Sequence, residues 1–281
     1  MSDRKIKTAC VQLRCGDDVA QNVRDAAEII RAARKDGAHF IATPENTDLM
    51  ALDGGSKLEK TFPEKDALAL PQFCALAEEL GIWLLIGSLA IKVSAGKTAN
   101  RSYLIGPNGR VGARYDKIHL FDVNLPSGET YRESNTVEPG DEAVTVSLPW
   151  GRLGLSVCYD LRFPQLYRTL AKAGAEILTV PSAFTETTGK AHWHVLLRAR
   201  AIENACFVVA PAQSGTHSSG RETYGDSLIV DYWGQVLSRL AKGTGVITAD
   251  IDLAKEAETR ARFPALDNRQ LGLPNVAAAL T

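Results

Sequence analysis

The sequence predicts an α/β fold, a four-layer α-β-β-α sandwich built from two pseudo-symmetric halves. Helical and strand patterns alternate along the chain, as in proteins whose helices cover a sheet. The order helix, Gly-Ala, apolar strand and proline occurs in residues 28–46 and returns in residues 166–184. Two such halves, each with a mixed sheet and its helices, are expected to pack sheet against sheet with the helices outside.

The first half begins with a strand expected over residues 5–13. A helix over residues 22–37 follows, and Gly37 supplies its C-terminal stop. Apolar side chains recur on one face of this helix, at Val23, Ala26, Ile30 and Ala33. The remaining elements are a short strand over 39–46 ended by Pro44, a helix over 70–81, a strand over 82–91, and two strands within 101–117 joined at Pro107-Asn108-Gly109.

The second half repeats these elements in the same order. Residues 206–215 correspond to the strand over 82–91, and residues 226–240 correspond to the paired strands that follow it. Ala38 and Ala175 are 137 positions apart, and Tyr103 and Leu228 are 125 apart. Because no Pro-, Ser- or Gly-rich linker divides the halves, residues 1–281 are expected to form a single domain. The weakly periodic residues 260–281 are expected to form a C-terminal arm.

The composition argues against several classes of protein. Charged residues make up 23% of the chain and the net charge is −1, so no overall field favours nucleic acid or an acidic membrane. Five irregularly spaced cysteines form neither a disulfide framework nor a CxxC pair. No apolar window has the length of a membrane span or a secretory signal. We therefore expect a cytoplasmic protein that binds neither nucleic acid nor membrane.

The sequence also predicts no metal and no organic cofactor. His192 and His194 are two positions apart on an expected helix, so their side chains point in different directions. No glycine-rich phosphate loop precedes a helix. Cys158 occupies the position where a GxSxG elbow needs its second glycine, which argues against a serine hydrolase.

Three ionisable or nucleophilic residues follow predicted strands, and together they form a coherent chemical set. They are Glu45, Lys117 and Cys158. A thiol needs a base to become a strong nucleophile, and burial is expected to raise the pKa of Glu45 towards useful base strength. The Lys117 ammonium and the backbone N–H of Tyr159 could stabilise an oxyanion.

Each of these residues also has a structural interpretation. Glu45 could cap a loop, Lys117 could be a solvated surface lysine, and Cys158 could be a buried inert thiol. We expect the four other cysteines to be inert, namely Cys10, Cys15, Cys74 and Cys206. His119, two residues after Lys117, either supports its loop or approaches the site.

The segments "ATPEN", "YDKIHLF" and "GLSVCYDLRFP" resemble the three signatures of the nitrilase superfamily of carbon–nitrogen hydrolases. They occur in that family's order, and the resemblance covers nearly the whole chain. It implies an α-β-β-α sandwich, with Cys158 as nucleophile, Glu45 as general base and Lys117 as stabiliser of the tetrahedral intermediate. A second glutamate positions the substrate amide in many members; the segment "YRES" selects Glu133 over Glu129 for this role.

The resemblance implies an amidase that converts a small carboxylate-bearing amide to acid and ammonia through a cysteine thioester. The loops are most similar to those of amidases that hydrolyse deaminated glutathione. An ω-amidase acting on α-ketoglutaramate or α-ketosuccinamate is the alternative, and a catalytically idle binding or regulatory member is a third. The candidate carboxylate contacts are Arg162, Thr185, Thr187 and Arg198. A homodimer or higher homo-oligomer is also implied.

Overall fold

The structure is a computed structural model that describes residues 4–51, 53–125 and 128–267. Within these residues, two six-stranded sheets form the centre of the protein. The first sheet consists of β1 (Lys5–Gln12), β2 (Phe40–Ala42), β3 (Trp83–Lys92), β4 (Thr98–Ile105), β5 (Val111–Asp116) and β16 (Gly245–Asp252), in the order β16-β1-β2-β3-β4-β5. The strands β1, β2 and β3 are parallel, and the other neighbours pair antiparallel.

The second sheet has the same arrangement. It consists of β8 (Thr145–Leu148), β9 (Gly151–Leu155), β10 (Ile177–Thr179), β11 (Phe207–Ala210), β14 (Ser227–Val230) and β15 (Val236–Leu240), in the order β15-β14-β11-β10-β9-β8. Here β9, β10 and β11 are parallel, and antiparallel strands flank them on both sides. The predicted pseudo-symmetry of the two halves is therefore confirmed at the level of strand order and direction.

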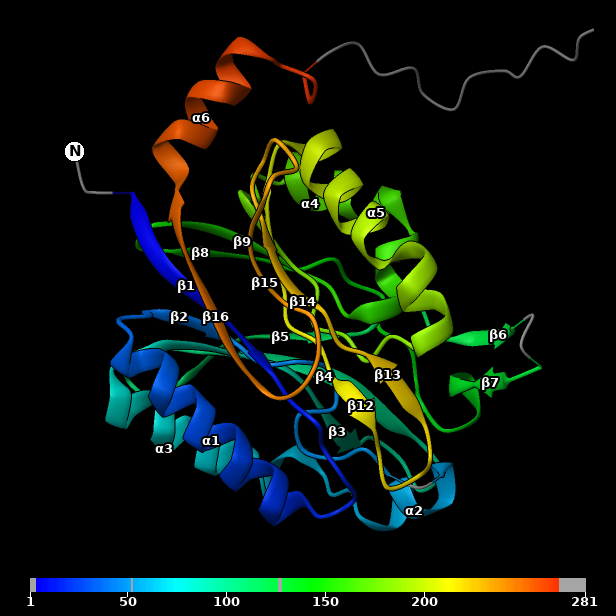
Figure 1. The fold of residues 1–281 in the computed structure, drawn as a ribbon. Helices are drawn as coiled ribbons and strands as arrows, with labels where there is room; N and C mark the ends of the chain where they lie inside the picture. Colours follow the sequence, from blue (N-terminus) through cyan, green and yellow to red (C-terminus); the bar gives the residue numbers. More distant parts are fainter. Residues whose placement is uncertain (1–3, 52, 126–127, 268–281) are drawn as a thin grey trace, which may run out of the picture.

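Helices cover the outer face of each sheet, so the predicted four-layer sandwich is confirmed (Figure 1). The helices α1 (Val19–Lys35) and α3 (Leu70–Leu80) lie against the first sheet. The helices α4 (Pro164–Lys172) and α5 (Glu186–Asn204) lie against the second. The helix α1 begins three residues before the predicted start, because Asp18 caps it: the Asp18 side chain accepts a hydrogen bond from the Gln21 N–H.

Alternate side chains along the central strands contribute to two different apolar cores. Ile41 and Leu84 of the first sheet pack with Ile30 of α1 in the outer core. Their neighbours Phe40 and Leu85 belong to the other core, which contains the strands of the second sheet. Successive residues of a strand point to opposite faces, and so each central strand contributes to two layers.

Several short elements lie outside the predicted pattern. They are α2 (Gly54–Glu59), η1 (Glu64–Asp66), β6 (Asp122–Asn124), β7 (Thr130–Arg132), η2 (Glu133–Asn135), η3 (Cys158–Arg162), β12 (Ser214–Thr216), β13 (Glu222–Tyr224) and α6 (Leu253–Arg262). Two hairpins, β6–β7 and β12–β13, form small separate sheets. Residues 260–262 of the predicted arm belong to α6, and residues 268–281 lie outside the described part.

The two halves approach closely where β2 and β10 end. Gly87 of β3 lies at this point, and a Cβ built there would be 2.2 Å from the Thr43 carbonyl oxygen and 2.4 Å from that of Pro44. The same Cβ would be 2.5 Å from Cβ of Pro181, which follows β10. Only a residue without a side chain fits between these backbones, and Gly87 therefore sets the distance between the sheets beside Glu45.

We expect the substitution Gly87→Ala to lower the free energy of unfolding by about 3 kcal/mol or more, because rigid backbone atoms must move to accept the methyl group. Urea denaturation of the purified variant measures this change. Gly96→Ala is the matched control, since a Cβ at Gly96 would meet no atom within 4 Å. Equal stability of the two variants would contradict the proposed packing constraint.

Candidate active site

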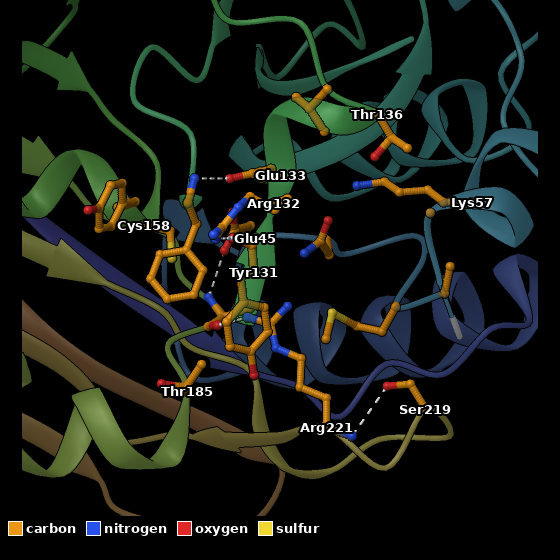
Figure 2. A pocket seen from close by; sticks show the side chains of 18 of the residues that line it. Glu45, Lys57, Tyr131, Arg132, Glu133, Thr136, Cys158, Thr185, Ser219 and Arg221 are labelled. Carbon is orange, nitrogen blue, oxygen red and sulfur yellow. Dashed lines mark hydrogen bonds between the residues drawn. The ribbon is translucent and has the colours of Figure 1, made fainter. Parts of the chain in front are cut away.

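The ends of β2, β5 and β9 bring Glu45, Lys117 and Cys158 to one cavity. Figure 2 shows Glu45 and Cys158 beside each other in it. Glu45 lies three residues beyond β2, Lys117 directly follows β5, and Cys158 lies three residues beyond β9. The cavity has a volume of about 720 Å³. All three side chains are nearly buried, with exposures of 3% for Glu45, 2% for Lys117 and 7% for Cys158.

Two carboxylates hold the Lys117 ammonium in place. Its Nζ lies 3.0 Å from Oε1 of Glu45 and 2.8 Å from Oε2 of Glu133. Glu133 begins the η2 turn after the β6–β7 hairpin, and its Oε2 also accepts the Phe121 N–H at 2.7 Å. A buried ammonium is costly unless paired, so this double ion pair fixes the relative positions of three chain segments.

Asn100 of β4 links the same two glutamates from the opposite side. Its Nδ2 donates to Oε1 of Glu45 at 2.9 Å and to Oε1 of Glu133 at 3.1 Å. Its Oδ1 is buried and has no hydrogen-bond partner among the described residues. Nothing in the local sequence singles out Asn100, because an asparagine within a strand of mixed polarity gives no signal of its distant partners.

A backbone N–H and a side-chain amide fix the second oxygen and the main chain of Glu45. Its Oε2 accepts the Ala183 N–H at 2.9 Å. Nε2 of Gln213 donates to the Glu45 carbonyl at 3.0 Å, and Gln213 is itself held because its Oε1 accepts the Cys15 N–H at 3.0 Å. The carboxylate is therefore oriented by residues of both halves.

Cys158 has a left-handed backbone conformation with φ of 52°. For a residue with a side chain, this conformation costs about 1–2 kcal/mol. The Cys158 N–H donates to the Pro181 carbonyl at 2.9 Å, which holds the strained residue at the end of the strand. The turn thus directs the thiol into the cavity rather than into the sheet.

Asp160 supports this turn. Its Oδ2 accepts the Tyr115 hydroxyl at 2.6 Å and the Val157 N–H at 2.8 Å, while its Oδ1 contacts His119 Nδ1 at 2.7 Å. The His119 ring also stacks on Phe163, with ring centroids 3.6 Å apart. Of the two predicted roles for His119, the structure gives it the supporting one, and it connects the segment after Lys117 to the turn of Cys158.

The pKa of Glu45 shifts in the opposite direction from the one we expected. Burial raises it, but the positive charge of Lys117, followed by interactions with Cys158 and Arg221, outweighs burial and holds the pKa below its ordinary value. We expected burial to dominate this pKa. That expectation was wrong, because a buried carboxylate needs a cation beside it, and the lowering effect of Lys117 and the other partners exceeds the raising effect of burial. Glu45 is therefore a carboxylate at neutral pH.

The pKa values of Cys158 and Lys117, the two partners of Glu45, shift upwards. Burial, followed by the negative charge of Glu45, raises the pKa of the Cys158 thiol well above its ordinary value, and Lys117 offsets only part of this effect. Burial lowers the pKa of Lys117, but the charges of Glu133 and Glu45 outweigh it and raise that pKa well above its ordinary value. The resting site holds a neutral thiol, a carboxylate base and an ammonium.

The structure distinguishes the two glutamates of the loop that follows Lys117. Glu133 lines the cavity and contacts both Lys117 and Asn100. Glu129 is exposed, and its Oε1 accepts the Tyr131 hydroxyl at 2.9 Å. Of the two glutamates, Glu133 is the one beside Lys117, and its role in positioning the substrate amide stays a prediction.

Two of the four predicted substrate contacts line the cavity, and so does Tyr159, the predicted oxyanion donor. Arg162 extends over the ring of Phe184, with its Cζ 5.6 Å from the ring centroid. Thr185 caps α5, and its Oγ1 lies 2.9 Å from Oγ1 of Thr188. Arg162 and Thr185 therefore line the cavity, and their contact with a substrate stays a prediction.

The other two predicted contacts do not line the cavity. Thr187 lies on the first turn of α5 with its side chain exposed, because the helical rotation turns it away from the cavity. Arg198 lies more than three turns along α5, and its Nε donates to the Gly234 carbonyl at 2.8 Å. Their positions do not fit the predicted carboxylate contacts, since a prediction based on residue type alone ignored the direction of the helix.

The two remaining candidate metal ligands, His192 and His194, have structural partners. His194 Nε2 lies 2.6 Å from Asp226, whereas Nδ1 of His192 lies 3.3 Å from Arg162. Among the described residues, no group of three or more His, Cys, Asp or Glu side chains is arranged to hold a metal ion.

No helix in the described ranges has the length and apolarity needed to cross a membrane. Burial raises the pKa of the four other cysteines, Cys10, Cys15, Cys74 and Cys206.

Comparison with known proteins agrees with this arrangement. Residues 7–261 match the family described as carbon-nitrogen hydrolase. The chain is 42% identical to the deaminated glutathione amidase of Synechocystis, over 93% of this chain and 97% of the relative. It is also 42% identical to the human deaminated glutathione amidase, over 93% of this chain and 81% of the relative. The crystal structure of Saccharomyces cerevisiae Nit3, a member of the nitrilase superfamily, aligns with a TM-score of 0.85 at 28% identity, over 95% of this chain and 97% of that chain.

We expect Asn100→Ala to lower the free energy of unfolding by about 1–3 kcal/mol, because the buried carboxylate of Glu45 and the partly buried carboxylate of Glu133 lose a hydrogen-bond donor. Chemical denaturation at neutral pH measures the change. Asn108→Ala removes the same group from an exposed turn, and we expect it to stay within about 0.5 kcal/mol of the wild type. If Asn100→Ala behaved like this control, the bridge between Glu45 and Glu133 would have no energetic role.

Proposed function

The chain belongs to the carbon-nitrogen hydrolase family, whose members act on carbon–nitrogen bonds, and from this premise we propose that it hydrolyses a small carboxylate-bearing amide through a thioester on Cys158. One observation carries the proposal: the Glu45 carboxylate, the Lys117 ammonium and the Cys158 thiol share one buried site. These groups supply a base, an oxyanion stabiliser and a nucleophile.

In the first half of the reaction, Glu45 accepts the thiol proton while Sγ of Cys158 forms a bond to the amide carbon. The carbonyl π electrons move to oxygen, and the Lys117 ammonium and the Tyr159 N–H stabilise the resulting oxyanion. When the oxyanion collapses, the carbon–nitrogen bond breaks and protonated Glu45 delivers its proton to the leaving amine. Glu133 keeps Lys117 in position and orients the amide.

The second half uses the same groups with water. Glu45 takes a proton from water as its oxygen attacks the thioester carbon, and a second oxyanion forms beside Lys117. Collapse expels Cys158, which recovers its proton from Glu45. The net reaction is amide plus water to acid plus amine, and the enzyme returns to its starting protonation state.

We propose deaminated glutathione as the substrate. The two curated relatives described above bear the name of this activity. Arg162 and Thr185 supply a guanidinium and a hydroxyl on the cavity wall, and the cavity volume of about 720 Å³ lies in the range of sites for small organic ligands. For this substrate the leaving amine is the amino group of cysteinylglycine; ammonia would be released only from a primary amide.

Two alternatives stay open. An ω-amidase would prefer α-ketoglutaramate or α-ketosuccinamate, so the ratio of kcat/KM values for deaminated glutathione and α-ketoglutaramate decides between the two substrates; we expect it to favour the former. A catalytically idle binding member would release no amine from any amide. The complete set of Glu45, Lys117, Glu133 and Cys158 argues against an idle member.

The homodimer or higher homo-oligomer and the cytoplasmic location stay predictions from the sequence. Light scattering coupled to size-exclusion chromatography measures the oligomeric state. Fluorescence microscopy of a tagged chain in its native host measures the location.

We expect Cys158→Ala to reduce the rate of amide hydrolysis at least 1,000-fold, to roughly the background of the assay, because no thioester can form. Released cysteinylglycine, or ammonia from a primary amide, measures the rate. Cys74→Ala is the control, since Cys74 is a partly buried thiol on α3 outside the cavity. Undiminished hydrolysis by Cys158→Ala would overturn the mechanism.

We expect kcat/KM to be nearly constant between pH 7 and 5. Glu45 acts as a carboxylate, and its lowered pKa means that it takes up a proton only below the ordinary carboxylate range. Lys117, with its raised pKa, stays charged throughout this interval. A tenfold fall in kcat/KM between pH 7 and 5, with the protein still folded by circular dichroism, would contradict the assignment of Glu45 as the base.

A further inference from the structure

Arg221 belongs to the wall of the cavity, although nothing in the sequence pattern singled it out. It directly precedes β13, in the segment that joins β12 to β13. Figure 2 shows its guanidinium directed from this segment towards Tyr131 and the side of the cavity below Glu45. The β12–β13 hairpin thus brings a cation from the second half of the chain to the site.

Two contacts hold the guanidinium in place. Nη2 donates to the Ala183 carbonyl at 2.6 Å. The guanidinium also lies over the ring of Tyr131, which belongs to β7, with its Cζ 5.4 Å from the ring centroid. Since the Ala183 N–H binds Oε2 of Glu45, the cation is anchored to the same residue that orients the catalytic base.

These contacts leave part of the guanidinium unused. Nε is buried and has no hydrogen-bond partner among the described residues. Neither an ion pair with a carboxylate nor a hydrogen bond from Nη1 is found for Arg221 in the described ranges. The Glu45 carboxylate is near enough for the charge of Arg221 to lower its pKa, but no carboxylate among the described residues is in ion-pair contact with Arg221. A carboxylate is the anion that best matches the planar donors that stay unused.

The other cations of the cavity differ from Arg221. Arg162 lies over the ring of Phe184, and its Nη1 and Nη2 each lie 3.3 Å from Nδ1 of His192. Lys117 is neutralised by two glutamates. Arg132 is exposed, and its guanidinium donates to the carbonyls of Val123 and Tyr131 and to the side chain of Asn124. Lys57 faces the charges of Glu133 and Glu45 across the cavity. Arg221 therefore combines a fixed position with unused donors beside the catalytic base.

We propose that Arg221 binds the carboxylate of the substrate and so selects anionic over neutral amides. This inference rests on the proposed hydrolysis of a carboxylate-bearing amide and adds the residue that recognises the carboxylate. Arg221 takes no part in bond making; it holds the acid group so that the amide carbon reaches Cys158. The competing interpretation is purely structural, a contact that fastens the β12–β13 hairpin to β7.

Two amides of equal chain length separate these interpretations: glutaramate, which bears a carboxylate, and pentanamide, which does not. We expect Arg221→Gln to lower kcat/KM for glutaramate about 10- to 100-fold, mainly through KM, and to change the value for pentanamide less than threefold. Arg221→Lys should recover part of the loss. Arg110→Gln, the same charge change at an exposed turn, should leave both values unchanged.

If pentanamide is hydrolysed too slowly to measure, the dissociation constants of glutaramate and pentanamide, measured in the inactive Cys158→Ala background with and without Arg221→Gln, provide the same comparison. An equal loss for both amides would show a structural role, and no loss would show no role; either result overturns the inference and leaves the proposed function intact. If the wild type fails to prefer glutaramate to pentanamide, the proposed carboxylate-bearing substrate is itself wrong, and the inference falls with it.

Discussion

The double ion pair at Lys117 is the interaction on which the rest of the site depends. The ammonium is 2% exposed and lies between Glu45 and Glu133, with Asn100 joining the two acids behind it. Removal of Lys117 would leave the buried Glu45 carboxylate without its ion-pair partner, which costs several kcal/mol. The end of β2, the end of β5 and the η2 turn must therefore meet in one geometry, and that geometry is also the one that catalysis needs.

The same ion pair decides which groups carry protons. It holds Glu45 as a carboxylate and leaves Cys158 as a thiol, because the nearby acid and burial both disfavour a thiolate. The nucleophile is therefore not ionised in advance, as it would be in a thiolate–imidazolium pair. Proton transfer to Glu45 becomes favourable when the carbon–sulfur bond forms and the new negative charge moves to an oxygen beside Lys117.

The sequence predicted the layers and the strand-end residues because both depend on local pattern. Periodicity identified the repeated helices and strands, and a residue that follows an apolar strand can be named without knowing its neighbours. Asn100 and Arg221 could not be found in this way, since their importance comes from Glu45, Glu133 and Ala183, which are distant in the chain. The direction of the Glu45 pKa shift was predicted wrongly for the same reason, because it depends on Lys117, a partner 72 positions away.

The two halves repeat one topology but contribute different chemistry. The offset of 137 positions pairs Pro44 with Pro181, and both prolines meet at Gly87 where the sheets converge. The next position is Glu45 in the first half and Ser182 in the second, so only one half supplies the base. The second half supplies Cys158 instead, whose N–H is fixed by the Pro181 carbonyl. Catalysis therefore requires the close approach that Gly87 permits, since neither half holds both the base and the nucleophile.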